Sequence, residues 1–224
     1  MTDFAAYIPV VNRFDLLENA IANCIDLHED LTIIDNSPGS GGIVKDDPSE
    51  IKIFRPPVPF TFAQSMNWML HDARDRGKAF CVYMHSDSLV PPGACLALLD
   101  YGRQIVASGR SWGLLWTFYD IMAAYNPQML DVIGEWDTNF PDYFGDNDWT
   151  HRINLASYEC INTGIKVGHV GSQTINSDPL LKHITSIKFP LYRQYYEQKW
   201  GGIPGKETFV SPFDMDWSKL ALKE

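Results

Sequence analysis

Short apolar runs alternate with helix-like segments over the first half of the chain. The apolar runs predict strands at residues 7–11, 31–34, 51–54 and 80–84. Between them, apolar residues recur at helical spacing and predict helices over about 16–26, 62–75 and 91–108. The run at 80–84 is apolar on both faces, as expected of a strand in the centre of a parallel sheet. This alternation predicts an α/β fold with a mostly parallel central sheet flanked by helices.

The pattern changes after residue 108. It predicts strands over 113–119 and 165–170 and helices over 127–133 and 146–157. From about Asp178 onward, polar and aromatic residues alternate without a helical period, so we expect an irregular C-terminal extension. No repeat, low-complexity tract or charged linker divides the sequence. We therefore expect one domain over residues 1–175, with residues 176–224 packing on it as an extension.

Composition narrows the class of protein. Of 224 residues, 45% are apolar, and 18 Lys+Arg against 28 Asp+Glu give a net charge of −10. Such acidity argues against broad, sequence-independent binding of nucleic acid, because that binding depends on Lys and Arg, although a local basic patch is not excluded. No apolar run approaches the roughly 18 residues that cross a bilayer, and the first residues lack the pattern of a signal peptide. We expect a cytoplasmic protein with no stable membrane insertion.

Polar residues follow three of the predicted strands. They are Asn12-Arg13, Asp35-Asn36 and His85-Ser86-Asp87. A single Asp at a strand end more often begins a turn, but ligands of open parallel sheets bind beyond the carboxyl ends of strands. Three such groups at one edge of the sheet therefore favour a binding site.

Two carboxylates and a histidine in the second half are further candidates. Asp146 and Asp148 lie where a helix is predicted to begin, and His169 lies at the end of the last predicted strand. Because residues two apart on a helix do not share a face, only one of the two Asp side chains is expected to face a site. The alternatives are that both complement the helix dipole and that His169 is an ordinary strand-end histidine.

The order of these segments resembles that of family 2 glycosyltransferases with the GT-A fold. The resemblance runs from about residue 6 to 171, and its order and spacing are more specific than any single motif. The segments that carry it are 8–13, 32–37, 62–67, 83–87, 133–137, 146–148 with Arg152, and His169; residues 195–202 also look like tails of such enzymes. The resemblance implies a GT-A-like nucleotide-sugar-binding fold and an inverting, metal-dependent transfer of a sugar to an acceptor hydroxyl.

The resemblance also implies a donor site and a metal site. Asp35 would accept a hydrogen bond from the base, and a UDP-sugar is the donor that we expect. The donor-binding residues would be Pro9, Asn12, Arg13, Asp35, Asn36, Asn67, His85 and Ser86. Asp87 corresponds to the metal-binding aspartate of an Asp-x-Asp motif whose first position is His85 here, and His169 would be a second ligand. Oxygen ligands suit Mg²⁺ or Mn²⁺, and an added imidazole favours Mn²⁺.

The same resemblance points to the catalytic base. The family's Glu-Asp pair before a helix corresponds to Gly145 and Asp146, so Asp146 is the first candidate. A positioned carboxylate suits the removal of a proton from an attacking hydroxyl. Asp148 stays as the alternative base, and Asp142 is a more distant one.

Aromatic residues make up 13% of the chain, and sugar rings pack on aromatic side chains. Trp136 and Tyr143 are the first candidates for the acceptor side, followed by Trp112, whereas Trp149, inside a predicted helix, is expected in the core. The acceptor stays open between a saccharide, a protein and a modified nucleic acid.

Two other functions remain open. A sugar nucleotidylyltransferase shares the α/β layout, but such enzymes carry a Gly-rich loop after the first strand, where this chain has Asn12-Arg13-Phe14-Asp15. A glycosyltransferase-like binding protein without turnover is the non-enzymatic alternative, because His85 and Gly145 depart from the family pattern.

Overall fold

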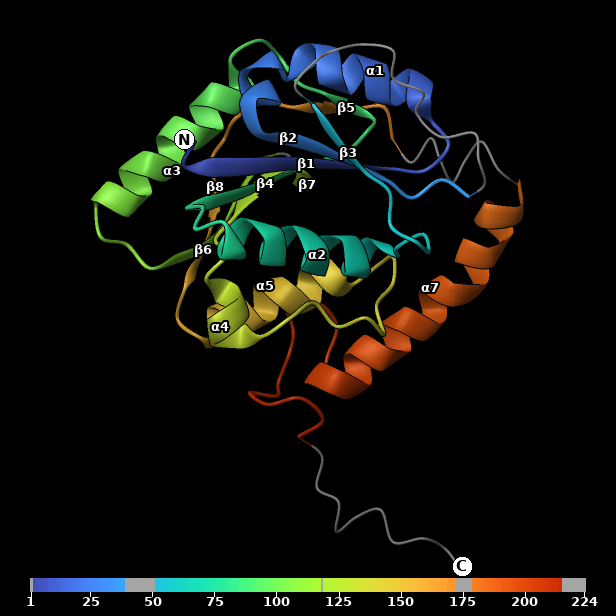
Figure 1. The fold of residues 1–224 in the computed structure, drawn as a ribbon. Coiled ribbons are helices and arrows are strands. Elements are labelled where there is room, and N and C mark those ends of the chain that lie inside the picture. Colours follow the sequence, from blue (N-terminus) through green and yellow to red (C-terminus); the bar gives the residue numbers. More distant parts are fainter. Residues whose placement is uncertain (1, 39–50, 118, 172–178, 215–224) are drawn as a thin grey trace, which may run out of the picture.

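The computed structural model describes residues 2–38, 51–117, 119–171 and 179–214, and a seven-stranded sheet forms its centre (Figure 1). The strand order is β3-β2-β1-β4-β7-β6-β8. All pairs are parallel except those that β7 makes with β4 and β6. The strands are β1 (Phe4–Val10), β2 (Leu31–Asp35), β3 (Lys52–Phe54), β4 (Phe80–Met84), β6 (Trp112–Thr117), β7 (Tyr119–Tyr125) and β8 (Glu159–Asn162).

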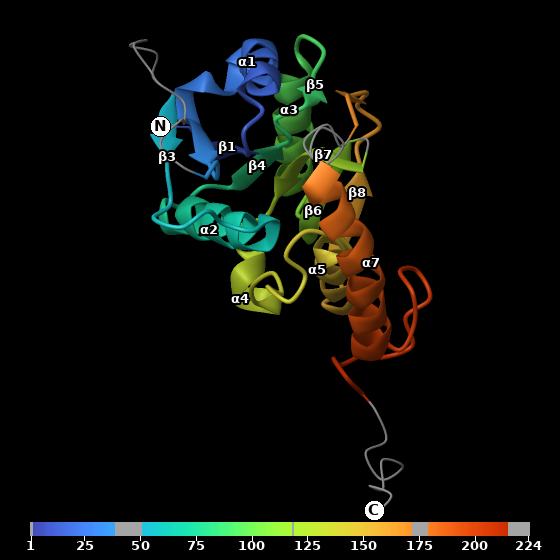
Figure 2. The same ribbon diagram turned by 90° about the vertical axis from the view of Figure 1, so that its right-hand side faces the viewer.

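Helices cover both faces of this sheet (Figures 1 and 2). One face carries α1 (Phe14–Asn23), a 3₁₀ helix (Ile25–Asp30) and α3 (Ala94–Ala107), and the other carries α2 (Phe62–Asp75), α4 (Met129–Ile133) and α5 (Gly145–Leu155). The central strands are buried on both sides for this reason, which explains why β2 and β4 are apolar runs rather than alternating ones. The mostly parallel α/β fold predicted from the sequence is confirmed.

Several predicted elements match closely, and two in the second half do not. Helix α2 and strand β4 have the predicted bounds. The single strand predicted at 113–119 covers β6 except for its first residue and reaches the first residue of β7, which turns back and lies between β4 and β6. The strand predicted at 165–170 is reduced to β9 (Gly168–His169), which pairs with β5 (Ser88–Leu89), and the sheet is completed by β8 from an earlier, more polar segment.

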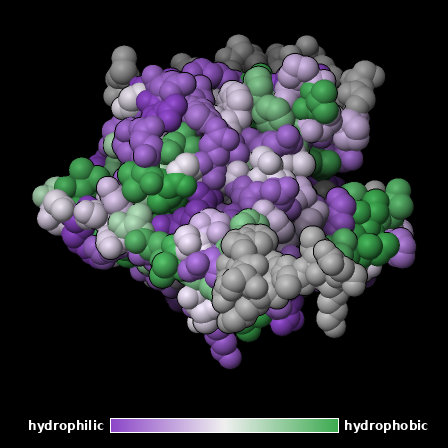
Figure 3. All heavy atoms as spheres, turned by 90° about the horizontal axis from the view of Figure 1, so that it is seen from below, coloured by the Kyte–Doolittle hydropathy of each residue, from purple (hydrophilic) through white to green (hydrophobic). Residues whose placement is uncertain are grey.

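The C-terminal extension corrects a prediction, because residues 179–200 form one helix, α7 (Pro179–Trp200). Its sequence shows no clear apolar stripe since only its end is buried, at Tyr196, Lys199 and Trp200. Its first half leaves large apolar side chains exposed, and Figure 3 shows hydrophobic atoms gathered at the edge where α7 lies in Figure 1. The domain boundary predicted near residue 175 falls outside the described residues. No helix in the described part of the chain is long and apolar enough to cross a membrane.

Candidate active site

A cavity of about 820 Å³ opens where the parallel strands end. Its floor comes from the ends of β1 and β4 and the start of β7, and its walls come from α2, the segment before α5, and α7. The volume is within the usual range for a small-ligand site. It is lined by Pro9, Val10, Val11, Asn36, Phe60, Thr61, Phe62, Ser65, Tyr83, His85, Ser86, Asp87, Asp120, Ile121, Asp142, Tyr143, Asp146, His169, Leu181, Ile184, Thr185 and Lys188.

Asp87 and His169 meet in this cavity although they are 82 positions apart. The short pairing of β5 with β9 puts Ser88 opposite His169, and the Val170 amide donates to the Asp87 carbonyl oxygen. The His169 Nε2 atom consequently lies 3.0 Å from Asp87 Oδ1. Burial raises the pKa of Asp87, but the two neighbouring histidines outweigh this effect and hold the pKa below its ordinary value.

His85 lies at the end of β4, where its amide continues the ladder by donating to the Ile121 carbonyl oxygen of β7. Its Nδ1 atom is 3.6 Å from Asp87 Oδ1, and its Nε2 atom is 3.7 Å from Asp120 Oδ1. Burial lowers the pKa of His85, but the interactions with Asp120 and Asp87 outweigh it and raise the pKa to about 9. His85 therefore lies between two carboxylates that both favour its protonated form.

Asp120 is a site residue that the sequence analysis missed. Ligand sites of parallel sheets lie at the carboxyl ends of the strands, but β7 is antiparallel, so its first residues, not its last, reach this edge. A carboxylate at the beginning of an apolar run is the signal that could have identified it. Asp120 faces the cavity with a side chain that is 27% exposed.

Asp146 lies in the first turn of α5 and lines the cavity. The residue before the helix, Phe144, has φ of 67°, a left-handed conformation that is costly for a bulky residue. Its ring packs against Phe189 and Tyr196 of α7, which compensates for that cost. Burial and the charge of Asp120 raise the pKa of Asp146, whereas backbone amides at the helix start lower it. The first two effects are the larger, and the pKa is about 6. Asp146 is thus a carboxylate whose basicity suits proton transfer near neutral pH.

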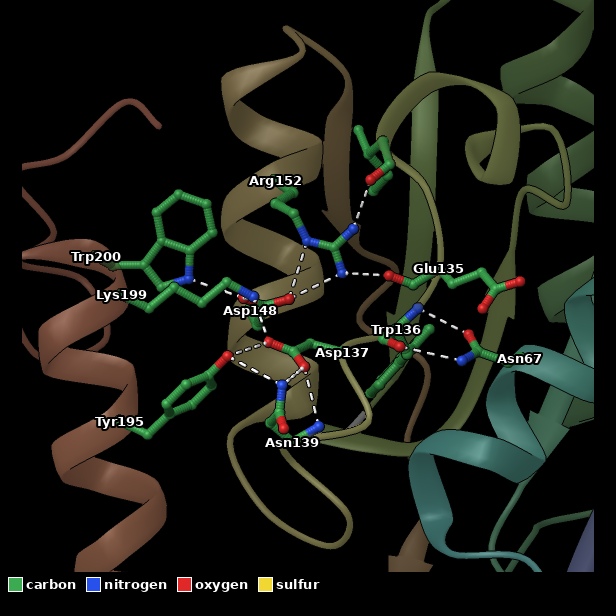
Figure 4. A network of polar contacts seen from close by, with 11 residues as sticks. Asn67, Glu135, Trp136, Asp137, Asn139, Asp148, Arg152, Tyr195, Lys199 and Trp200 are labelled. Carbon is green, nitrogen blue, oxygen red and sulfur yellow. Dashed lines mark hydrogen bonds and ion pairs between the residues drawn. The ribbon is translucent and has the colours of Figure 1, made fainter. Parts of the chain in front are cut away.

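Asp148 lies on the other side of α5 and is fully buried. Its Oδ1 atom accepts from Trp200 Nε1 at 2.8 Å and pairs with Lys199 Nζ at 2.6 Å, and its Oδ2 atom pairs with Arg152 at 2.8 Å (Figure 4). Lys199 also pairs with Asp137 at 2.7 Å. Asp148 does not line the cavity, because its Oδ1 atom joins α5 to α7 and its Oδ2 atom is held by Arg152 of the same helix. Of the two candidate bases, Asp146 is therefore the one that faces the cavity.

The predicted donor residues divide into two groups. Pro9, Asn36, His85 and Ser86 line the cavity, whereas Asp35, Asn12, Arg13 and Asn67 do not. The four outside the cavity have other partners: Asp35 accepts from Arg55 and the Ser37 amide, the backbone amide of Asn12 donates to Ser37 Oγ, Arg13 pairs with Asp15, and Asn67 bonds the Trp136 backbone. Direct contact of these four residues with a donor stays a prediction.

The predicted acceptor aromatics also divide. Tyr143 lines the cavity, but Trp112 and Trp136 are 5% and 2% exposed and lie in the core. Trp112 packs against Phe80, and Trp136 stacks on Trp149, which is a core residue as predicted. The opposite wall comes from α7, through side chains that the sequence analysis did not select: Leu181, Ile184, Thr185 and Lys188.

The residues at the strand ends fit a divalent cation. His85, Asp87 and His169 each offer one ligand atom, and these atoms lie within 4.8 Å of one another. A carboxylate oxygen together with imidazole nitrogens suits Mn²⁺ better than Mg²⁺, which prefers all-oxygen ligands.

Comparison with solved structures identifies the fold. The mannosyltransferase PcManGT from Pyrobaculum calidifontis, in complex with GDP-Man and Mn²⁺, superposes with a TM-score of 0.57 at 14% identity over 85% of this chain and 64% of that one. Glucosyl-3-phosphoglycerate synthase from Mycobacterium tuberculosis, with Mn²⁺ and UDP-glucose, gives 0.52 at 14% identity over 83% of this chain and 78% of that one.

This chain thus spans less than two thirds of the mannosyltransferase. No family model and no curated protein matches its sequence. The sheet order, the cavity at the strand ends and these superpositions together show that the chain has a GT-A-like fold, as found in glycosyltransferases that act on nucleotide sugars.

Proposed function

We propose that the protein is a metal-dependent inverting glycosyltransferase that moves a sugar from a nucleotide-sugar donor to an acceptor hydroxyl. The observation that carries this proposal is the convergence of Asp87, His169 and Asp146 on one cavity at the strand ends of a GT-A-like fold. The fold neighbours were solved with GDP-mannose or UDP-glucose and Mn²⁺, which supports a nucleotide-sugar donor here.

The cavity offers distinct surfaces to the two substrates. The nucleoside would lie over Pro9, Val10 and Val11 at the end of β1, with Asn36 beside it. Asn36 is held in place because its Nδ2 donates to Ser65 Oγ and its Oδ1 accepts from the Phe60 amide. A divalent cation held by Asp87 and His169 would offset the charge of the diphosphate leaving group.

Asp146 performs the proton transfer in this proposal. Its carboxylate accepts the proton of the acceptor hydroxyl while the hydroxyl oxygen bonds to the anomeric carbon, and the bond from that carbon to the diphosphate oxygen breaks. Attack from the face opposite the diphosphate inverts the anomeric configuration. Tyr143 and the α7 side chains Ile184 and Thr185 would contact the acceptor.

The test is donor turnover by the purified protein. With Mn²⁺ and a panel of UDP-, GDP- and dTDP-sugars, we expect at least one donor to raise the melting temperature and to release its nucleoside diphosphate slowly by hydrolysis. EDTA and the substitution Asp87→Asn should abolish the release, whereas Asp100→Asn, at an exposed position on α3, should not. NMR of the released sugar should show the inverted anomer.

Three results would contradict the proposal in different ways. No thermal shift with any donor would exclude a sugar-nucleotide site. Donor binding without hydrolysis or transfer, even with a wide acceptor panel, would identify a binding protein. Release of pyrophosphate from a nucleoside triphosphate and a sugar phosphate would identify a nucleotidylyltransferase instead.

A further inference from the structure

His85 stands where an Asp-x-Asp motif has its first aspartate. Its ring lies between two carboxylates, those of Asp87 and Asp120. Its Nδ1 atom faces Asp87 at 3.6 Å, and its Nε2 atom faces Asp120 at 3.7 Å. The two ring nitrogens therefore have separate environments. One faces Asp87 and the cavity, and the other faces the first residues of β7.

The imidazole is close enough to Asp87 and His169 to share an ion with them. The rings of His85 and His169 have centroids 5.2 Å apart with an angle of 76° between their planes, so the two rings are not stacked. The ligand atoms of the three side chains lie within 4.8 Å of one another. Ligand atoms about 2.1 Å from one ion stand about 3 to 4.2 Å apart, so small side-chain shifts bring all three into range.

The Nε2 atom of His85 gives a second, independent observation. It is buried and has no hydrogen-bond partner among the described residues, although the Asp120 carboxylate is its neighbour. Closing the 3.7 Å separation by roughly 0.7 Å makes an ordinary N–H···O bond. Metal-binding histidines almost always donate their second N–H to a carboxylate, a backbone carbonyl or water, which fixes the tautomer and the ring orientation.

We propose that His85 is a third protein ligand of the divalent cation, through Nδ1, and that Asp120 is the positioning residue that holds its Nε2–H. The inference rests on the proposed function for the presence of a cation, and it changes the ligand set from one imidazole to two. A carboxylate with two imidazoles selects Mn²⁺ over Mg²⁺ more strongly than a carboxylate pair does.

The test measures metal binding rather than sugar transfer. Mn²⁺ affinity is determined by electron paramagnetic resonance for the full chain, with and without UDP, and nitrogen ligands are counted from the ¹⁴N modulation of the bound ion. We expect two imidazoles in the native protein and one in His85→Gln. We expect Mn²⁺ affinity to fall at least 10-fold in His85→Gln and 10- to 100-fold in Asp120→Asn. Matched controls are His71→Gln and Asp100→Asn, at exposed positions on α2 and α3, which should bind as the native protein does.

The alternative is a protonated His85 that bridges Asp87 and Asp120 without touching the ion. It predicts one imidazole on the ion in the native protein and no loss of ¹⁴N signal in His85→Gln, and either result overturns the inference. So does the absence of Mn²⁺ binding with and without UDP. Should His85→Gln fail to fold, the imidazole count in the native protein decides the question.

The inference and the proposed function fail separately. Two imidazoles on a bound Mn²⁺ with no turnover of any donor would support the ligand set and contradict the transferase. Turnover with a single imidazole on the ion would do the reverse.

Discussion

Replacing the two aspartates at the start of α5 by asparagine should change the stability of the protein in opposite directions. Asp146→Asn and Asp148→Asn each replace a carboxylate by an amide of nearly equal size, two positions apart on one helix. Asp148 is fully buried between two cations, whereas Asp146 is partly exposed to the cavity and lies near another carboxylate. The first environment favours the negative charge and the second opposes it.

For Asp148→Asn we expect a loss of stability. Removal of one partner of a buried ion pair costs about 3–5 kcal/mol. Lys199 retains Asp137, and Arg152 retains the carbonyl oxygens of Ile133 and Glu135, so the lower figure of about 3 kcal/mol applies. For a chain of this size, 3 kcal/mol lowers the melting temperature by about 6–12 °C.

For Asp146→Asn we expect a gain in stability together with a loss of activity. Since burial and Asp120 raise the pKa of Asp146 from 3.8 to about 6, ionising this group at pH 8 costs the folded state up to about 3 kcal/mol. Partial exposure screens the charge, so we expect about 1–2 kcal/mol of added stability in the variant. The gain is present above pH 6 and disappears below pH 4, where Asp146 is protonated in both the folded and the unfolded state.

The assay is thermal unfolding followed by circular dichroism at pH 8 and pH 4, with donor hydrolysis measured on the same samples. The native protein and Asp131→Asn, an exposed aspartate on α4, are the references. An Asp148→Asn variant that melts within 2 °C of the native protein, or an Asp146→Asn variant that melts below it at pH 8, would refute the assignment of the two environments.

Three further predictions concern the pH dependence of activity and the substitution of Asp30 and Asn36. Hydrolysis or transfer should have a kcat/KM that rises with pH and is half-maximal at or slightly below pH 6, because Asp146 must be ionised to accept a proton and a nearby cation lowers its pKa of about 6. Asp30→Asn should lower stability at pH 7 by about 2 kcal/mol, since burial raises the pKa of Asp30 but Arg76 and Lys78 outweigh it and lower the pKa to about 2. Asn36→Ala should cost about 1–3 kcal/mol and raise the KM for the donor, because the Phe60 amide loses its partner beside the cavity.

Each of these predictions has its own control. A kcat/KM that does not change with pH between pH 5 and pH 7 would show that Asp146 is not the catalytic base. The stability that Asp30 contributes is complete above pH 4 and is lost as the pH falls toward 2, so Asp30→Asn and the native protein should converge near pH 2, and parallel acid-unfolding curves would contradict the pairing. An Asn36→Ser variant, which can still accept a hydrogen bond, should recover part of the donor KM; equal defects in both variants would contradict the role of Asn36 in holding that wall.

The first half of the fold was predictable because its strands and helices each bury a continuous face. Helix α2 has an apolar period and a capping box between Thr61 and Gln64, and it matches its predicted bounds. Helix α7 could not be predicted in this way, because large apolar side chains in its first half are exposed and Pro190 lies near its middle. The antiparallel direction of β7 was equally hidden, since an apolar run carries no information about strand direction.

Site residues could be predicted where the adjacent residues in the sequence were enough to show that a side chain lies at the edge of the sheet. The sequence Ser86-Asp87 after a buried strand and Asp146 at a helix start both reached the cavity. The choice between Asp146 and Asp148 depends on the position of Lys199, which lies some 50 residues later in the sequence. Trp136 is buried in the core, which its neighbours in sequence did not indicate. Contacts between distant segments decide which of two similar residues is accessible.

The pairing of β5 with β9 has a consequence for how the chain folds. Only two residues on each strand form this ladder, too few to be stable alone, and it closes a loop of about 80 residues. Most of the sheet can therefore assemble before His169 joins it, and we expect the segment around His169 to open more easily than the seven-stranded sheet. An ion bound between Asp87 and His169 would act as a cross-link across that loop. Metal removal should then be detected first as faster amide hydrogen exchange at residues 168–170, well before the sheet itself unfolds.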